Sequence, residues 1–322
     1  MFQQTYNYWG DFSRLPPHRR ANVDVVAHDV ITEASQIQTG LATNDIQLGE
    51  ITASVMEDFL KDNAASVFKF PQAYPSVFIF NMYPGSVFSN NPALREAIAY
   101  ALDMDSICQA ETRGTGKATG TYGHNKLAGY NPAWENKYWG YDPVKAKAKL
   151  QEAGIKPGQL KLRVLTNELI NGLTVAQANL ADIGVTLEIN LQDETQFLLS
   201  RTQCNLLTWD LCVYGVVPRG FIMIALNTLN DIKAYEWGPI GGSKDQALYD
   251  ITYKALYNQT QANIDAAFEA TIKKLNYLPL YQAYDFVGAN KKIISPVRGN
   301  DQETAAHASL FADDYDVYYQ PK

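Results

Sequence analysis

The segment VYGVVPRG, Val213 to Gly220, carries the residues best suited to hold a ligand: an aromatic ring, glycines and a permanent positive charge. Arg219 is always protonated, and its planar guanidinium donates paired hydrogen bonds to carboxylate or phosphate groups. In a cleft it would therefore favour an anionic ligand. The sequence is equally compatible with Arg219 on the outer face of a loop, so both interpretations stand.

Aromatic residues near this segment offer stacking contacts. Tyr214 and Trp237 are candidates because an aromatic side chain gives a large contact area with a polar handle. Trp209 lies in the leucine-rich stretch LLTWDLCVYG, and core packing is favoured for it over ligand contact.

Motifs of known enzyme classes are absent from the sequence. It contains no Gly-x-Ser-x-Gly elbow and no His-Glu-x-x-His pair. The loop RGTGKATGTYG resembles a phosphate loop only loosely, because Ala118 follows Lys117 where a magnesium-binding hydroxyl is needed. We therefore expect a protein that is not an enzyme and has no cofactor.

Histidines and cysteines show no metal-site spacing. The four histidines, of which His124 is the one considered for ligand contact, are widely scattered, and the three cysteines lack the close pairing of zinc sites. Buried thiols are the default expectation, and a bridge between Cys204 and Cys212 stays open as the less favoured alternative.

Composition limits the range of functions. The chain has 322 residues, 46% of them hydrophobic, a net charge of −7 and a pI near 5.2. An acidic chain of this kind disfavours nucleic-acid binding, which needs clustered positive charge. No apolar run approaches the roughly 20 residues that span a bilayer, and the first residues do not follow the pattern of a secretory signal.

Local patterns predict the elements that must position these residues. Asn91 and Pro92 open an amphipathic helix with an apolar stripe, and Asp142 with Pro143 opens another that ends at Gly154. Alternating strands around 160–164 and 185–189 enclose a helix over 174–183, and this strand-helix-strand unit predicts α/β architecture. Further stretches predict a strand over 206–215, a helix over 264–275 and extended structure from 278.

Several blocks, in the right order, resemble the periplasmic oligopeptide, dipeptide and nickel-binding proteins of ABC importers, the bacterial extracellular solute-binding protein family 5. The blocks are NYWG, VFIFN, NPALREAIAYALDMDSI, YDPVKAKAKLQEAGI and LPLYQ. Within the long helical block, Arg95 and Asp103 match the family pattern, and we expect structural roles for both at the helix edges.

The resemblance implies a two-lobed α/β fold of the class II, cluster C type. Lobe one would comprise residues 1–83 and 277–322, and lobe two residues 84–276. Family members normally have a signal peptide and further lobe-one sequence before the NYWG position, so we expect an N-terminally truncated chain with lobe one incomplete.

The resemblance also implies where a ligand would bind: in the cleft between lobes, lined by crossover strands and lobe edges. In peptide binders the loop at 213–220 usually supplies an acid that pairs with the ligand's amino terminus. Here no Asp or Glu occurs between Asp210 and Asp231, and Arg219 occupies the neighbourhood. The expected ligand-binding residues are Asn81, Tyr83, Tyr122, His124, Tyr214, Gly215, Arg219 and Trp237.

The function expected from the resemblance is the substrate-binding component of a peptide/nickel-type ABC importer. It would work with the importer's membrane subunits in the periplasm or outside the cell, associated with the membrane through an anchor absent from this sequence. The alternative is a structural or interaction fragment of such a protein that no longer binds ligand.

Overall fold

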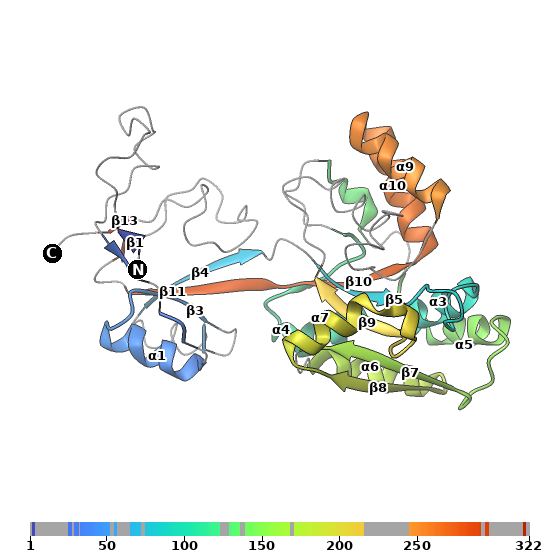
Figure 1. Ribbon diagram of the computed structural model, residues 1–322, viewed down its shortest axis with the longest axis horizontal. Helices are drawn as coiled ribbons and strands as arrows, with labels where there is room; N and C mark the ends of the chain where they lie inside the picture. The colour runs from blue at the N-terminus through green and yellow to red at the C-terminus, as the bar shows by residue number, and fades with distance from the viewer. Residues whose placement is uncertain are drawn as a thin grey trace. The chain divides into compact units, whose positions relative to one another are not determined.

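The protein comprises two compact units. In the computed structural model, one unit consists of Met1–Gln72 with Tyr284–Lys322 and the other of Ala73–Ala283 (Figure 1). The structure describes residues 2–3, 25–27, 29–31, 33–51, 55–56, 65–71, 75–122, 129–135, 139–167, 171–215, 245–290, 294–295 and 318–319.

The unit boundaries differ from those expected for the lobes, at 83/84 and 276/277. The strands β5 (Ser76–Phe80) and β10 (Tyr277–Gln282), assigned by that expectation to the first lobe, pair with each other inside the sheet of the second unit. Each is buried there among strands and helices of that unit, so their packing keeps them with it.

The first unit contains a three-stranded antiparallel sheet in the order β3-β11-β4, together with helix α1. Leu41 of α1 packs with Ile51 and Phe286 of the sheet in a small core. At the centre of the β3–β11 pair Gly288 lies opposite Gly49, and a Cβ on Gly288 would come 2.8 Å from the Leu41 side chain. The helix can therefore approach the sheet closely. The elements of this unit are β1 (Phe2–Gln3), β2 (Val25–Val26), α1 (Ala34–Thr43), β3 (Leu48–Ile51), β4 (Ala65–Pro71), β11 (Tyr284–Asn290), β12 (Ile294–Ser295) and β13 (Tyr318–Tyr319).

The second unit is built on a mixed six-stranded sheet in the order β6-β10-β5-β9-β7-β8. Strands β7, β8 and β9 run parallel to one another, whereas β5 is antiparallel to both β9 and β10. The remaining strands are β6 (Lys117–Ala118), β7 (Leu160–Thr166), β8 (Val185–Leu191) and β9 (Leu211–Gly215).

Helices cover both faces of this sheet. They are α3 (Pro92–Ala101), α4 (Met104–Thr112), α5 (Pro143–Glu152), α6 (Asn171–Asp182), α7 (Glu194–Thr202), α9 (Gln246–Tyr257) and α10 (Gln261–Lys274), with short 3-10 turns η3 (Pro132–Trp134) and η4 (Cys204–Leu206). Among the described residues, none of the helices is both long enough and apolar enough to cross a bilayer.

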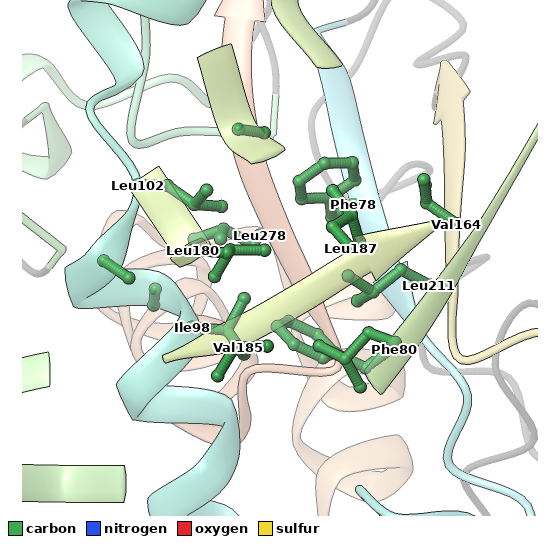
Figure 2. Packing of buried hydrophobic residues seen from close by; sticks show 14 of the residues in the cluster. Phe78, Phe80, Ile98, Leu102, Val164, Leu180, Val185, Leu187, Leu211 and Leu278 are labelled. Carbon is green, nitrogen blue, oxygen red and sulfur yellow. The ribbon is translucent and has the colours of Figure 1, made fainter. Parts of the chain in front are cut away.

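The alternation of side chains along the strands divides the core into two clusters. Phe78 and Phe80 of β5 face the cluster that includes α3 to α6, and Figure 2 shows them packed near Leu211 and Leu278. Residues of the opposite parity, such as Val77, face a cluster rich in aromatic rings that includes α7, α9 and α10. The prediction of α/β architecture is confirmed.

The predicted helix starts and the strand-helix-strand unit are also confirmed. Asn91 Oδ1 accepts a hydrogen bond from Leu94 N at 3.1 Å, and Asp142 Oδ1 accepts one from Lys145 N at 2.8 Å, each just before a proline in the first turn. Side-chain caps of this kind satisfy backbone donors that a helix start otherwise leaves free. Strands β7 and β8 pair in parallel on either side of α6 in the sequence.

Arg95 and Asp103 have the structural roles expected of them. The Arg95 guanidinium is buried and donates to the carbonyl oxygens of Phe88 at 2.5 Å and Lys274 at 3.3 Å. Asp103 caps α4 by accepting from both the backbone N and the hydroxyl of Ser106.

The strand predicted over 206–215 is shorter in the structure. Leu206 ends the turn η4, Leu207 has a left-handed φ of 52°, and β9 begins only at Leu211. A left-handed residue cannot lie in a regular strand. Trp209 lies in the core as predicted, and its Nε1 donates to Ser200 O at 2.9 Å.

Candidate functional site

The carboxyl edge of the second unit's sheet is the end at which the parallel strands β7, β8 and β9 terminate. In the same place β5 begins, since Ser76 pairs with Gly215, and β10 approaches its end, since Tyr281 pairs with Ser76. Open α/β sheets bind their ligands outside the carboxyl ends of parallel strands. Ala283, the last residue of this unit, directly follows β10.

Tyr214, on the penultimate residue of β9, is the aromatic residue at this edge. Its side chain is half-buried against the aromatic-rich cluster, and its strand neighbour is Val77. The Arg201 guanidinium lies over its ring, 4.2 Å from the centroid. This contact connects helix α7 to the end of strand β9 at the carboxyl edge.

Helix α7 positions Arg201 for this contact. Asp193 caps the helix by accepting from Gln196 N at 3.0 Å, and Phe197 anchors it in the core. Arg201 follows Phe197 by one helical turn, so the two side chains share a face. Its guanidinium is 5.7 Å from the Phe197 ring centroid as well.

The Arg201 guanidinium is incompletely satisfied. Its Nη1 is buried, and no residue in the part of the chain that the structure describes accepts a hydrogen bond from it. None of the ion pairs among those residues includes Arg201. A buried donor without a partner costs about 1–3 kcal/mol. Contacts with ring faces leave the in-plane N–H groups of a guanidinium available.

The positive charge of Arg201 affects the pKa of the Cys212 thiol. Burial raises the pKa of Cys212 to about 12, although the positive charge of Arg201 acts in the opposite direction. The thiol is therefore neutral at physiological pH and provides no counter-charge. The structure holds Cys108, Cys204 and Cys212 as buried free thiols, in agreement with the default expectation.

Asn81 lies at the opposite end of β5 from this edge, about 17 Å away at roughly 3.4 Å per strand residue. It is fully buried, and its Nδ2 donates to the carbonyl oxygens of Cys204 and Trp209, each at 3.0 Å. Its Oδ1 accepts from the backbone N of Tyr83, also at 3.0 Å. With donors and acceptor engaged, the Asn81 amide holds the chain together at this end.

Tyr83 lies next to Asn81 and packs, partly buried, against the aromatic-rich cluster. Tyr122 is fully buried inside the same cluster, where its hydroxyl donates to Tyr277 O at 2.9 Å. Burial raises the pKa of Tyr122. These surroundings are those of core residues.

The expected ligand-binding residues are thus not all brought together. Tyr214 and Gly215 share the carboxyl edge, Asn81 and Tyr83 share the opposite end, and Tyr122 is within the core. His124, Arg219 and Trp237 lie outside the described residues. Across the described residues no group of three or more His, Cys, Asp or Glu side chains could hold a metal ion.

Sequence reasoning missed Arg201. The available signal was its spacing of four from Phe197 in a helix that follows a parallel strand, a pattern that places the two side chains on one helix face. Its partner Tyr214 lies on β9, the strand that follows α7, and only the packing of the helix on the sheet shows that contact.

The fold defines the chain as an α/β protein of the class II periplasmic-binding-protein type, as comparison with known proteins shows. The chain is similar, across 99% of its length, to the "ABC transporter-associated periplasmic binding protein DppA from Helicobacter pylori in complex with peptide STSA", with a TM-score of 0.79 and 25% identity. A dipeptide-binding protein from Pseudoalteromonas sp. SM9913, in complex with Met-Leu, matches 91% of the chain with a TM-score of 0.73 and 16% identity.

The family described as "Bacterial extracellular solute-binding proteins, family 5 Middle" matches residues 2–220. The chain belongs to this family. The "Dipeptide-binding protein" of Escherichia coli (strain K12) is 24% identical over 152 residues. The chain spans 26% of that protein, 60% of the Helicobacter protein and 57% of the Pseudoalteromonas protein.

Proposed function

We propose that this chain is the substrate-binding component of a peptide/nickel-type ABC importer and captures a small solute or peptide. The observation that carries the proposal is the family match over residues 2–220. The candidate binding surface is the carboxyl edge of the second unit's sheet, in keeping with the general preference of open α/β sheets.

Peptides are the favoured substrate class. The structure of the Helicobacter relative is a complex with the peptide STSA, and that of the Pseudoalteromonas relative is a complex with Met-Leu. The chain would act by binding, without enzymatic turnover, and would deliver its ligand to the membrane subunits of the importer. It would do so in the periplasm or outside the cell, associated with the membrane.

The alternative proposal is a fragment that keeps the fold but does not capture ligand. Ligand-dependent stability separates the two, because a ligand at 100 times its dissociation constant adds about 2.7 kcal/mol to the free energy of unfolding. We would measure urea unfolding of the full chain alone, with Ser-Thr-Ser-Ala, with Met-Leu, and with a pool of random di- to tetrapeptides.

Peptide capture predicts that at least one of these additions raises the urea midpoint in a saturable, concentration-dependent manner. Unchanged midpoints with both peptides and with the pool would contradict the proposal and favour the fragment.

A further inference from the structure

We infer that Asn171 is a site of spontaneous deamidation, in which the backbone nitrogen of Gly172 attacks its side chain, and that Glu111 of α4 controls the rate. The reaction requires no bound solute and is independent of the proposed function. Asn171 is exposed at the start of α6, and it forms with Gly172 the single Asn-Gly pair of the sequence. Glycine in the second position favours the reaction, because it has no Cβ to hinder the attack and its backbone rotates most freely.

The reaction needs water and no other reactant. The backbone nitrogen of Gly172 bonds to Cγ of Asn171, and the bond from Cγ to the side-chain nitrogen breaks. Ammonia leaves and takes with it the proton of the Gly172 nitrogen, which gives a cyclic succinimide. Water then opens the ring at either carbonyl carbon, so the products are aspartate and isoaspartate, of which the second has a longer backbone.

The packing of α6 on α4 explains why a glycine follows Asn171. Gly172 is buried, and a Cβ at this position would lie 3.0 Å from Ile107 Cγ2 and 3.1 Å from the Ile107 carbonyl oxygen. Because protein interiors are closely packed, a side chain here would have to displace Ile107. The close approach of the two helices therefore keeps a reactive pair at the start of α6.

Glu111 holds the atom that must attack. Its Oε2 accepts a hydrogen bond from Gly172 N at 3.2 Å. This bond fixes the direction of the N–H group, and the negative carboxylate opposes loss of the proton, since a neighbouring like charge disfavours an anion. The first turn of α6 also has to open, because helical side chains tilt toward the N-terminus and away from the following backbone nitrogen.

A second hydrogen bond between the same two helices provides a matched control. Asn179 lies about two turns further along α6, and its Oδ1 accepts from Asp103 N at 3.0 Å. This bond holds α6 on α4 away from the reacting atoms. Its removal therefore separates loosening of the helix pair as a whole from release of the Gly172 nitrogen.

The full chain would be incubated at slightly alkaline pH, both folded and in urea, and deamidation at position 171 would be followed by mass spectrometry of its peptides. We expect the folded wild type to react at least about 10-fold more slowly than the chain in urea, because the reaction has to wait for local opening. Glu111→Ala should accelerate the folded protein by about 10-fold, the effect of losing a hydrogen bond to a charged group. Glu111→Gln keeps an acceptor without the charge and should accelerate it less. Asn179→Ala should match the wild type.

Urea unfolding of each variant shows whether it is folded. No reaction at position 171 in urea overturns the site itself. Equal rates for the folded wild type and the chain in urea, or an unchanged rate in a folded Glu111→Ala variant, overturn the role of Glu111. Equal acceleration by Asn179→Ala and Glu111→Ala also contradicts that role, because the helix pair as a whole would then protect Asn171. If Glu111→Ala does not fold, Glu111→Gln decides: a faster reaction supports the inference and an unchanged rate contradicts it.

Discussion

The two ends of the β5–β9 strand pair use similar polar residues for different purposes. At the Asn81 end, the amide of Asn81 and the carboxylate of Asp210 bind backbone groups and Arg163, and both residues are buried. At the carboxyl edge, Arg201 rests on Tyr214 with a buried Nη1 that lacks an acceptor. The side-chain amide of Asn276, at the Asn81 end, is buried without a hydrogen-bond partner among the described residues as well. The difference between the two ends therefore lies in the charge of the group that lacks a partner, which is a guanidinium at the carboxyl edge and a neutral amide at the Asn81 end.

At the Asn81 end, backbone hydrogen bonds connect the ends of neighbouring strands. The Asn81 backbone N donates to Asp210 O at 2.9 Å, and Asp210 N donates to Arg163 O at 2.9 Å, so three strands are tied in sequence. Phe80 N donates to Asn276 O at 2.9 Å and extends the connection to the start of β10. A ligand would have to break these bonds in order to use the same groups.

The largest effect is expected from Asn81→Ala. The substitution leaves the buried carbonyls of Cys204 and Trp209 without the amide donor. Each such loss costs about 1–3 kcal/mol, so we expect a destabilisation of about 3 kcal/mol in urea unfolding. Asn90→Ala, at an exposed position, is the matched control and should change stability by less than about 0.5 kcal/mol. A loss equally small for Asn81→Ala would remove the distinction between the two ends.

A smaller, pH-dependent effect is expected at Asp245, which caps α9 and bonds Lys274 at the end of α10, next to the start of β10. Burial acts to raise the pKa of Asp245, but the hydrogen bond from Lys274 and the backbone donors outweigh it, and the net pKa is lowered from 3.8. A lowered folded-state pKa gives stability that is present above the unfolded pKa and lost as pH falls through the folded value.

We therefore expect Asp245→Asn to cost about 0.5–1 kcal/mol at pH 7, since the pair is partly exposed and asparagine still caps a helix. As the pH falls below 3.8 and through the lowered folded-state pKa of Asp245, the two proteins should converge in stability. Unfolding curves across this pH range provide the measurement, and a difference independent of pH would show that the charge pair is not its source.

The smallest effect on stability is expected from Arg201→Met. The variant loses ring contacts worth about 0.5–1 kcal/mol but also removes a buried donor that lacks a partner. Methionine keeps favourable contact with the aromatic rings. Without ligand, the free energy of unfolding should change by less than about 1 kcal/mol. A loss above about 2 kcal/mol would assign Arg201 a structural role like that of Arg163.

Local sequence patterns predicted much of the fold because caps and periodicity are local. Asn91 and Asp142 mark helix starts through a side-chain bond to a nearby backbone N, which the sequence displays directly. The strand predicted from Leu206 was too long, since its apolar run gave no sign of the left-handed turn at Leu207.

The site was harder to predict because its contacts join distant segments. Asn81 follows an apolar strand, as a ligand-binding residue does, but its partners Cys204 and Trp209 are more than a hundred residues away in sequence. Tyr214 was identified as a candidate from its type and place, whereas Arg201 was not, because only the packing of α7 on the sheet brings the two together.

Hydrogen exchange of the full chain, with and without the pool of random di- to tetrapeptides, tests the central distinction most directly. Binding at the carboxyl edge predicts slower exchange in α7 and around Tyr214 and Gly215, with unchanged exchange around Asn81 and Asp210. Protection confined to the Asn81 end would contradict the account.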